Sequence, residues 1–334
     1  MKIVTIKDVA RAARVSISTV SRVLNQRQAV DPDTRERVIT TVRKMNYVRN
    51  MSASNLKQQH IAAVGIILSG RRNAFLTTLA EQVLDTGRGT GYQFIIEVID
   101  EKANQLLAAH QLYLEHKLWG VIFLGSRHGI QEETRILEVP QVYVTVSAEY
   151  LHSPFISSVS VDNRLAGKTA VEQLIKAGHR RIALLGYFGK ENDSTGLRLY
   201  GAVEAMEAAG IRYDPALYRE CDFTLASGRE NTRKLLEQGI PFTAMFTAGD
   251  LMAIGARKAL GEAGLRVPDD VSIIGFDGLE IGRYLNPTIA TMVQPIDPMA
   301  EEAVLLMKEL IEGKPSRHVL LGCDYLPGGS VQNL

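Results

Sequence analysis

From residue 61 onward the sequence alternates short apolar runs with amphipathic stretches, and this alternation restricts the possible folds most strongly. Seven runs have the branched and aromatic composition of buried strands: IAAVGIIL (61–68), YQFIIEV (92–98), WGVIFLG (119–125), QVYVTV (141–146), RIALLG (181–186), TAMFTA (243–248) and DVSIIGF (270–276). Helical spacing appears between them, as in RLAGKTAVEQLIKAG (164–178). We therefore predict repeated βαβ units in doubly wound parallel sheets, with binding sites at the carboxyl ends of the strands.

Length and composition indicate a globular protein with more than one domain. The chain has 334 residues, of which 46% are hydrophobic and 22% are charged, and a single core seldom grows beyond about 250 residues. No apolar run approaches the ~20 residues that span a bilayer, and no secretion signal is recognisable. Cys221 and Cys323 lack metal-ligand spacing. We therefore expect a cytoplasmic protein with reduced thiols and with neither a metal nor a cofactor.

Charge is distributed unevenly along the chain. Residues 1–60 contain twelve Lys and Arg against four Asp and Glu, a net charge of +8, and because the whole chain carries +1 the remainder carries −7. A compact basic segment favours a polyanionic partner such as nucleic acid. A merely solvated basic surface would give the same composition, so the spacing of the side chains has to decide between the two.

The basic segment has the spacing of three short helices. Three apolar stripes are visible: Ile6, Val9, Ala10 and Ala13; then Val20, Val23 and Leu24; then Val38, Ile39, Val42 and Met45. Ser16 is a suitable N-cap for the second helix, and Asp31 followed by Pro32 is a typical start for the third. This pattern predicts a small all-α helix-turn-helix domain at residues 1–48, with its second helix in the major groove of DNA.

Polar side chains of this domain are candidates for DNA contacts. Five residues lie on the outer side of the second helix: Ile17, Ser18, Ser21, Arg22 and Asn25. We expect Ile17 and Ser18 to select bases and Arg22 to contact a guanine or a phosphate. Three hydroxyl groups are expected to contact the phosphate backbone: those of Thr5, Ser16 and Thr19.

The segments TIKDVARAARVSISTVSRVLN and DPDTRERVITTVRKMNYVRN resemble the DNA-binding headpiece of the LacI/GalR family of bacterial transcription regulators. SVDNRLAGKTAVEQLIKAGHRRIALLG, GDLMAIGARKAL and VPDDVSIIGFDGLEIGRYLNPTIATMVQP resemble later family segments, in the family's order. The resemblance covers nearly the whole chain. It implies that residues 49–60 form a hinge that becomes helical on DNA, where Asn50, Ala53 and Leu56 match minor-groove positions and Leu56 opens the central base step. Arg49 replaces a proline that is common before the hinge.

The resemblance also implies that residues 61–334 form a two-lobed α/β body of the periplasmic-binding-protein-like type I, which binds an effector between its lobes and dimerises. Crossings between the lobes are expected near Ser160, Ala290 and Gly322, so that the N-lobe comprises 61–160 and 291–322 and the C-lobe 161–290 and 323–334. Seven residues match effector-lining positions: Phe75, Ser194, Arg198, Phe223, Asp250, Asp277 and Gln294. Gly249 stands where many relatives carry an asparagine, which is expected to open room for a bulkier effector.

The chemical class of the effector is less constrained than its place. A guanidinium group opposite a carboxylate suits the hydroxyls of a sugar. Arg71, Arg72 and Lys190 are candidates for contact with a sugar phosphate, although solvated loop side chains would give the same sequence. The alternative effector is a nucleobase or nucleoside. Trp119 is expected to pack against a strand and not to stack on a sugar.

Two other classes of function fit parts of the sequence. A solute-binding protein would share the body but would not need the basic domain. An enzyme would need a catalytic motif, yet GRGTGY (87–92) follows a helix, GSRHG (125–129) lacks the order of a nucleophile elbow, and His179 is expected to be structural. We therefore predict a repressor of carbohydrate-utilisation genes that is not an enzyme and binds a palindromic DNA operator as a homodimer.

Overall fold

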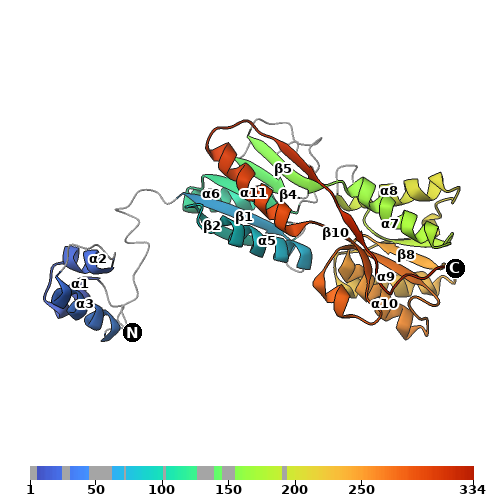
Figure 1. Ribbon diagram of the computed structural model, residues 1–334, viewed down its shortest axis with the longest axis horizontal. Coiled ribbons are helices and arrows are strands. Elements are labelled where there is room, and N and C mark those ends of the chain that lie inside the picture. Colours follow the sequence, from blue (N-terminus) through green and yellow to red (C-terminus); the bar gives the residue numbers. More distant parts are fainter. Residues whose placement is uncertain are drawn as a thin grey trace. The chain divides into compact units, whose positions relative to one another are not determined.

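The computed structural model describes residues 6–24, 31–44, 62–70, 73–100, 103–125, 139–144, 155–189 and 194–334. The chain divides into two units, Met1–Ile61 and Ala62–Leu334, and each is described separately (Figure 1). Within the described residues, no helix is both long enough and apolar enough to cross a membrane.

Three helices form the first unit: α1 (Ile6–Ala13), α2 (Ile17–Leu24) and α3 (Pro32–Lys44). Small and branched side chains fill its core: Val9, Ala10, Ala13, Val20, Val23 and Val38. Oγ of Ser16 caps α2 by accepting a hydrogen bond from the Thr19 amide at 3.1 Å, and Oδ2 of Asp31 caps α3 by accepting one from the Thr34 amide at 3.0 Å. The predicted helix-turn-helix domain is therefore present.

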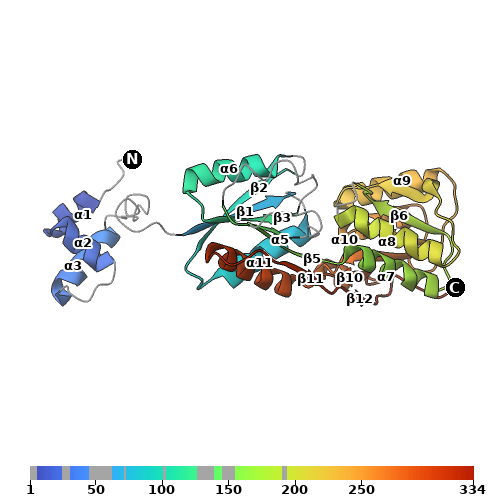
Figure 2. The ribbon, with the colours of Figure 1, turned by 90° about the horizontal axis from the view of Figure 1, so that it is seen from above.

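The first lobe of the second unit contains a six-stranded, fully parallel sheet in the order β11-β5-β4-β3-β1-β2. Its strands are β1 (Ala63–Ser69), β2 (Gln93–Ile99), β3 (Gly120–Leu124), β4 (Gln141–Val144), β5 (Ile156–Val161) and β11 (His318–Leu321). Helices α5 (Ala74–Gly87) and α11 (Ile296–Ile311) cover one face, and α6 (Gln105–His116) covers the other (Figure 2).

The second lobe contains a sheet in the order β12-β10-β9-β8-β6-β7, in which only β12 is antiparallel to its neighbour. Its strands are β6 (Ile182–Gly186), β7 (Tyr218–Glu220), β8 (Ala244–Thr247), β9 (Ser272–Asp277), β10 (Ala290–Val293) and β12 (Asp324–Leu326). The helices are α7 (Asn163–Lys176), α8 (Ser194–Ala208), α9 (Leu225–Glu237) and α10 (Asp250–Glu262), with the short 3-10 helices η3 (Pro215–Leu217) and η4 (Glu280–Tyr284). The predicted fold class is confirmed.

Two lobe boundaries differ from the expected positions. Strand β10 pairs with β9, so the second crossing follows Val293, three residues beyond Ala290. Strand β5 continues to Val161, so the first crossing lies one residue beyond Ser160. The third crossing lies between β11 and β12. Trp119 also differs from its expected role, because 46% of its surface is exposed.

Candidate functional site

Helix α2 presents a polar face to solvent. Val20 and Val23 are buried in the core of the first unit, whereas Ile17, Ser18 and Arg22 are exposed, with 46% of the Ile17 surface accessible. Thr19 and Ser21 are partly exposed. Apolar, hydroxyl and guanidinium groups on one outward face are the types that meet bases and phosphates in a major groove.

Hydroxyl groups gather at the start of this helix. Oγ of Ser16 lies 2.7 Å from Oγ of Ser18 and 2.8 Å from Oγ1 of Thr19, so the Ser16 hydroxyl is hydrogen-bonded to both of the other hydroxyls. The other predicted contact residues lie outside the described residues: Thr5, Asn25, Asn50, Ala53 and Leu56 of the DNA set, and Arg71, Arg72 and Lys190 of the phosphate set.

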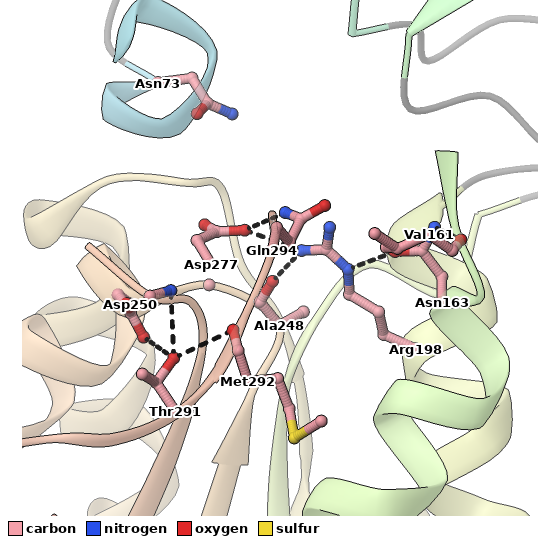
Figure 3. Close-up of polar contacts among 12 residues, drawn as sticks. Asn73, Val161, Asn163, Arg198, Ala248, Asp250, Asp277, Thr291, Met292 and Gln294 are labelled. Atoms are coloured by element: carbon pink, nitrogen blue, oxygen red, sulfur yellow. Dashed lines mark hydrogen bonds and ion pairs between the residues drawn. The ribbon is translucent and has the colours of Figure 1, made fainter. Parts of the chain in front are cut away.

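The carboxyl ends of the strands in the second lobe hold a buried charged pair (Figure 3). Arg198 on α8 is 4% exposed, and Asp277, the last residue of β9, is 5% exposed. Nη1 of Arg198 donates to the Ala248 carbonyl at 2.7 Å and lies 3.3 Å from Oδ1 of Asp277, while its Nε donates to Oδ1 of Asn163 at 2.8 Å. The side-chain positions of Arg198 and Asp277 are therefore fixed by the protein itself.

Gln294 extends this arrangement, and we call Arg198, Asp277 and Gln294 the polar centre. Nε2 of Gln294 donates to Oδ1 of Asp277 at 2.7 Å. Its Oε1 is buried and accepts no hydrogen bond from the described residues. A buried acceptor without a donor costs about 1–3 kcal/mol, so such an atom calls for a specific explanation.

Asp277 has an unusual backbone conformation and an unusual acidity. Its φ is 109°, which residues other than glycine rarely adopt. Desolvation raises the pKa of its carboxyl to about 6, against the opposing effects of the Arg198 charge and the Gln294 hydrogen bond. A strained backbone and a perturbed carboxyl in one residue are features that accumulate at functional sites.

Asp250 is hydrogen-bonded to the segment that follows Asp277 and to strand β10. Its Oδ2 accepts a hydrogen bond from the Leu279 amide at 2.7 Å, and its Oδ1 accepts one from the Thr291 hydroxyl at 2.7 Å. These bonds fix the segment that follows Asp277. The sequence resemblance placed Asp250 among the effector contacts, and this stays a prediction, because each carboxylate oxygen keeps a second lone pair beyond the bonds to Leu279 and Thr291.

The pKa of Asp250 predicts a pH effect on stability. Burial, followed by the nearby Asp277 charge, raises its pKa to about 8. The folded state therefore binds this proton more tightly than the unfolded chain, whose Asp pKa is about 3.9, and this contribution to stability is lost as the pH rises from about 4 to about 8. Asp250→Asn should flatten this slope in urea unfolding measured across that range. An unchanged slope would contradict the assignment.

Two glycines bring α7 and α8 close enough to position Arg198. A Cβ on Gly167 would lie 1.9 Å from the carbonyl oxygen of Arg198, and a Cβ on Gly201 would lie 1.9 Å from the carbonyl oxygen of Arg164. The two helix backbones therefore touch where no side chain fits. This contact places Asn163, the first residue of α7, beside the Arg198 guanidinium group.

Gly167→Ala should therefore destabilise the second lobe. Its methyl group would force the two helices apart, and overpacking of this kind typically costs about 1–3 kcal/mol of unfolding free energy, occasionally more. Gly261→Ala on α10 is the matched control, because a Cβ there meets no atom within 4 Å, and such a change usually stabilises by about 0.4–1 kcal/mol. Urea unfolding of both variants tests the prediction, and equal effects would contradict it.

The remaining predicted effector residues differ in their surroundings. Phe75 is buried in the core of the first lobe, and Ser194 is the first residue of α8. The Phe223 ring stands over Gly249, where a Cβ would lie 2.8 Å from Cδ1 of the phenylalanine. The glycine at 249 was expected to open room for a larger effector, but the Phe223 ring occupies that room.

Sequence reasoning missed three polar residues near the polar centre. Asn163 hydrogen-bonds Arg198, and Thr291 hydrogen-bonds Asp250. Asn73, the N-cap of α5 in the first lobe, lies opposite Asp277 and Gln294 (Figure 3). The usable signal was positional, because Asn73 and Asn163 each follow a strand closely in a fold that places its sites at strand ends.

His179 is structural. Its Nδ1 is hydrogen-bonded to Oγ1 of Thr243 and its Nε2 to Oγ of Ser272, each at 3.0 Å, and burial lowers the pKa of the ring. The ring thus joins the segments that precede β8 and β9. No ring nitrogen remains for acid–base chemistry, in agreement with the sequence interpretation.

A helix-turn-helix unit joined to a two-lobed α/β body is the arrangement typical of one class of protein, the transcription regulators that respond to small molecules. A family model described as bacterial regulatory proteins, lacI family, matches residues 5–50, and a periplasmic binding protein-like domain matches residues 171–331. The transcriptional regulator MalR of Clostridium butyricum is 34% identical over 98% of this chain and 99% of its own length. The transcriptional repressor CytR of Escherichia coli (strain K12) is 32% identical over 99% of this chain and 97% of its own length.

Solved structures agree with these relatives. The lac repressor dimer bound to operator and the anti-inducer ONPF is 28% identical, with a TM-score of 0.78 over 99% of this chain and 100% of its own. The regulator CelR, solved in complex with cellobiose, is 28% identical, with a TM-score of 0.73 over 98% of this chain and 99% of its own. The chain belongs to the LacI family of bacterial regulatory proteins. It is a DNA-binding transcriptional repressor and not an enzyme.

Proposed function

We propose that this repressor controls carbohydrate-utilisation genes and that a sugar or sugar phosphate bound at the polar centre changes its affinity for an operator. The observation that carries the proposal is the buried Oε1 of Gln294, which has no donor among the described residues and lies beside the Arg198–Asp277 pair. A sugar hydroxyl would supply that donor. Fixed donors and acceptors around one small volume are typical of sites for polar ligands.

On the DNA side, each headpiece of a homodimer would read one half of a palindromic operator. Eight headpiece residues would contact the DNA: Thr5, Ser16, Ile17, Ser18, Thr19, Ser21, Arg22 and Asn25. Asn50, Ala53 and Leu56 of the hinge, residues 49–60, would enter the minor groove. The lac repressor, similar over its full length, is a dimer on its operator. The protein would act in the cytoplasm, where that DNA is found.

Effector binding would involve residues of both lobes of the body. Asn73, from the first lobe, lies opposite the polar centre of the second, so a ligand contacting both would favour one lobe arrangement over others (Figure 3). Phe75, Ser194 and Phe223 would line the same site, and Arg71, Arg72 and Lys190 would contact the phosphate of a sugar phosphate. The cellobiose complex of CelR supports a sugar in the corresponding body.

A thermal-shift screen of the full-length protein tests the effector assignment. The panel contains neutral sugars, sugar phosphates and nucleosides. A ligand at about 100 times its Kd stabilises the native state by about 2.7 kcal/mol, which raises the melting temperature. We expect a sugar or sugar phosphate to do so. A shift given by nucleosides alone would contradict the proposed effector class.

Gln294→Met serves as the matched variant in this screen. Methionine is similar in size to glutamine but lacks the acceptor Oε1. The rise in melting temperature caused by the ligand should therefore be smaller, while the operator affinity without ligand stays unchanged. Retention of the full shift would show that Gln294 does not contact the ligand.

A further inference from the structure

A hollow lies in the body, away from the polar centre. Its volume is about 720 Å³, and it lies at the end of the second sheet where β6 begins. Strand β6 runs from Ile182 in this hollow to Gly186 at the opposite end, and its neighbour β8 ends there next to Ala248, the carbonyl partner of Arg198. The length of the sheet therefore separates the two sites.

Three exposed arginines line this hollow, which we call the arginine pocket: Arg180, Arg181 and Arg212. Nη1 of Arg180 donates to the carbonyls of Ile175 and His179 at 3.0 Å each, and Nε of Arg181 donates to the Pro241 carbonyl at 2.6 Å. These bonds to neutral acceptors hold two guanidinium groups in place. Each of the two keeps further N–H groups that these bonds do not use.

The pocket has an excess of positive charge. Within the described residues, none of the three arginines forms an ion pair with a carboxylate. Asp214 is the acidic residue of the lining, and its Oδ1 already caps η3 by accepting a hydrogen bond from the Ala216 amide at 3.0 Å. The phenol of Tyr213 is protonated at neutral pH, as an ordinary tyrosine is, so it can act as a hydrogen-bond donor. Three cations and one anion leave the pocket with an excess of two positive charges.

The rest of the lining is apolar. Besides the charged groups, the lining includes four buried apolar side chains, those of Ile182, Met206, Ile211 and Leu217. A solvated basic surface on a convex part of the molecule needs no such concave apolar floor. The volume falls within the ~300–1,000 Å³ that is usual for small-molecule sites.

We propose that the arginine pocket binds a small organic phosphomonoester. The planar guanidinium groups match phosphate oxygens in pairs, and the phenol of Tyr213 adds a further donor. The carbon skeleton of the ligand would lie on the apolar floor. This site would give the protein a second small-molecule input, independent of the polar centre.

Isothermal titration calorimetry of the full-length protein with phenyl phosphate tests the proposal, at constant ionic strength. We expect binding of one probe per chain, weakened at least about tenfold by Arg212→Gln, because a hydrogen bond to a charged group is usually worth that much. Arg212 is chosen because its side chain makes no hydrogen bond to the described residues, so its replacement leaves the fold intact. Arg212→Lys keeps the charge but lacks the planar guanidinium group. Its affinity for phenyl phosphate should lie between that of the wild type and that of Arg212→Gln.

Three controls make the outcome decisive. Arg229→Gln removes an exposed arginine of α9 that pairs with Glu262, and it should bind the probe as the wild type does. Phenol should bind far more weakly than phenyl phosphate. Inorganic phosphate should bind more weakly than phenyl phosphate, because it lacks the carbon skeleton that would lie on the apolar part of the lining. Absence of binding at millimolar probe, insensitivity to Arg212→Gln, or equal loss in Arg229→Gln would overturn the proposal and leave the function proposed for the polar centre untouched.

Discussion

Arg22→Ala is expected to remove specific binding to the operator while effector affinity measured without DNA stays within about twofold of wild type, because Arg22 belongs to a separate folding unit from the polar centre. Arg22 is exposed on α2, and a guanidinium group paired with a guanine contributes about 1–3 kcal/mol of discrimination. A homodimer makes this contact twice. The expected loss for the operator is therefore more than about 30-fold. Fluorescence anisotropy with operator and random duplexes measures it.

Arg37→Ala is the matched control for the loss of charge. Arg37 is exposed on α3 and lies outside the predicted recognition helix. Its replacement removes one positive charge, which should weaken operator and random duplexes by the same factor, because attraction to phosphates carries no sequence information. If Arg22→Ala also weakened both duplexes equally, Arg22 would contact only the backbone, and its predicted role in choosing the sequence would be wrong.

Arg198→Met is expected to produce the largest loss of stability. The change leaves Asp277 buried without its cation, and breaking a buried pair in this way typically costs about 3–5 kcal/mol. It should also abolish the effector response. Because the pKa of Asp277 is about 6, this carboxyl is protonated at about pH 5, and the loss of stability should be smaller there than at about pH 7.5. Urea unfolding at both pH values checks the prediction.

The double variant with Arg198→Met and Asp277→Asn separates the charge from the packing. Removing both charges leaves no unpaired ion, so most of the stability lost in Arg198→Met should return, although the effector response should not. A single variant that loses less than about 1 kcal/mol, the usual value of an exposed pair, would show that the pair is not buried as described.

The fold could be predicted from the sequence because its signals are local. Apolar runs such as IAAVGIIL and RIALLG carry the composition of buried parallel strands, and Ser16 and Asp31 mark helix starts that the structure reproduces. The boundary at β10 could not be predicted in the same way. Ala290–Val293 has only four residues, and its pairing with β9 is a tertiary contact that no local pattern reveals.

The candidate site was predicted in part. The family resemblance identified Arg198, Asp277 and Gln294, and the structure brings these three together. The resemblance did not reveal the hydrogen bonds of Asp250 within the protein. Its partners, Leu279 and Thr291, are about 30 to 40 residues away in the chain, and no local pattern indicates such contacts. The arginine pocket could not be predicted from the sequence for the same reason, because its lining comes from two segments, residues 180–182 and 206–217.

The central claim is that effector binding to the body changes the affinity of the headpiece for DNA. Measuring operator binding with and without the effector tests it most directly. The full-length protein is titrated onto DNA from upstream of its own gene, with and without the sugar that raises its melting temperature. We expect the operator Kd to change by about 5- to 150-fold and the sugar Kd to change by the same factor when operator is bound. A sugar that binds the protein but leaves operator affinity unchanged would contradict the proposed coupling.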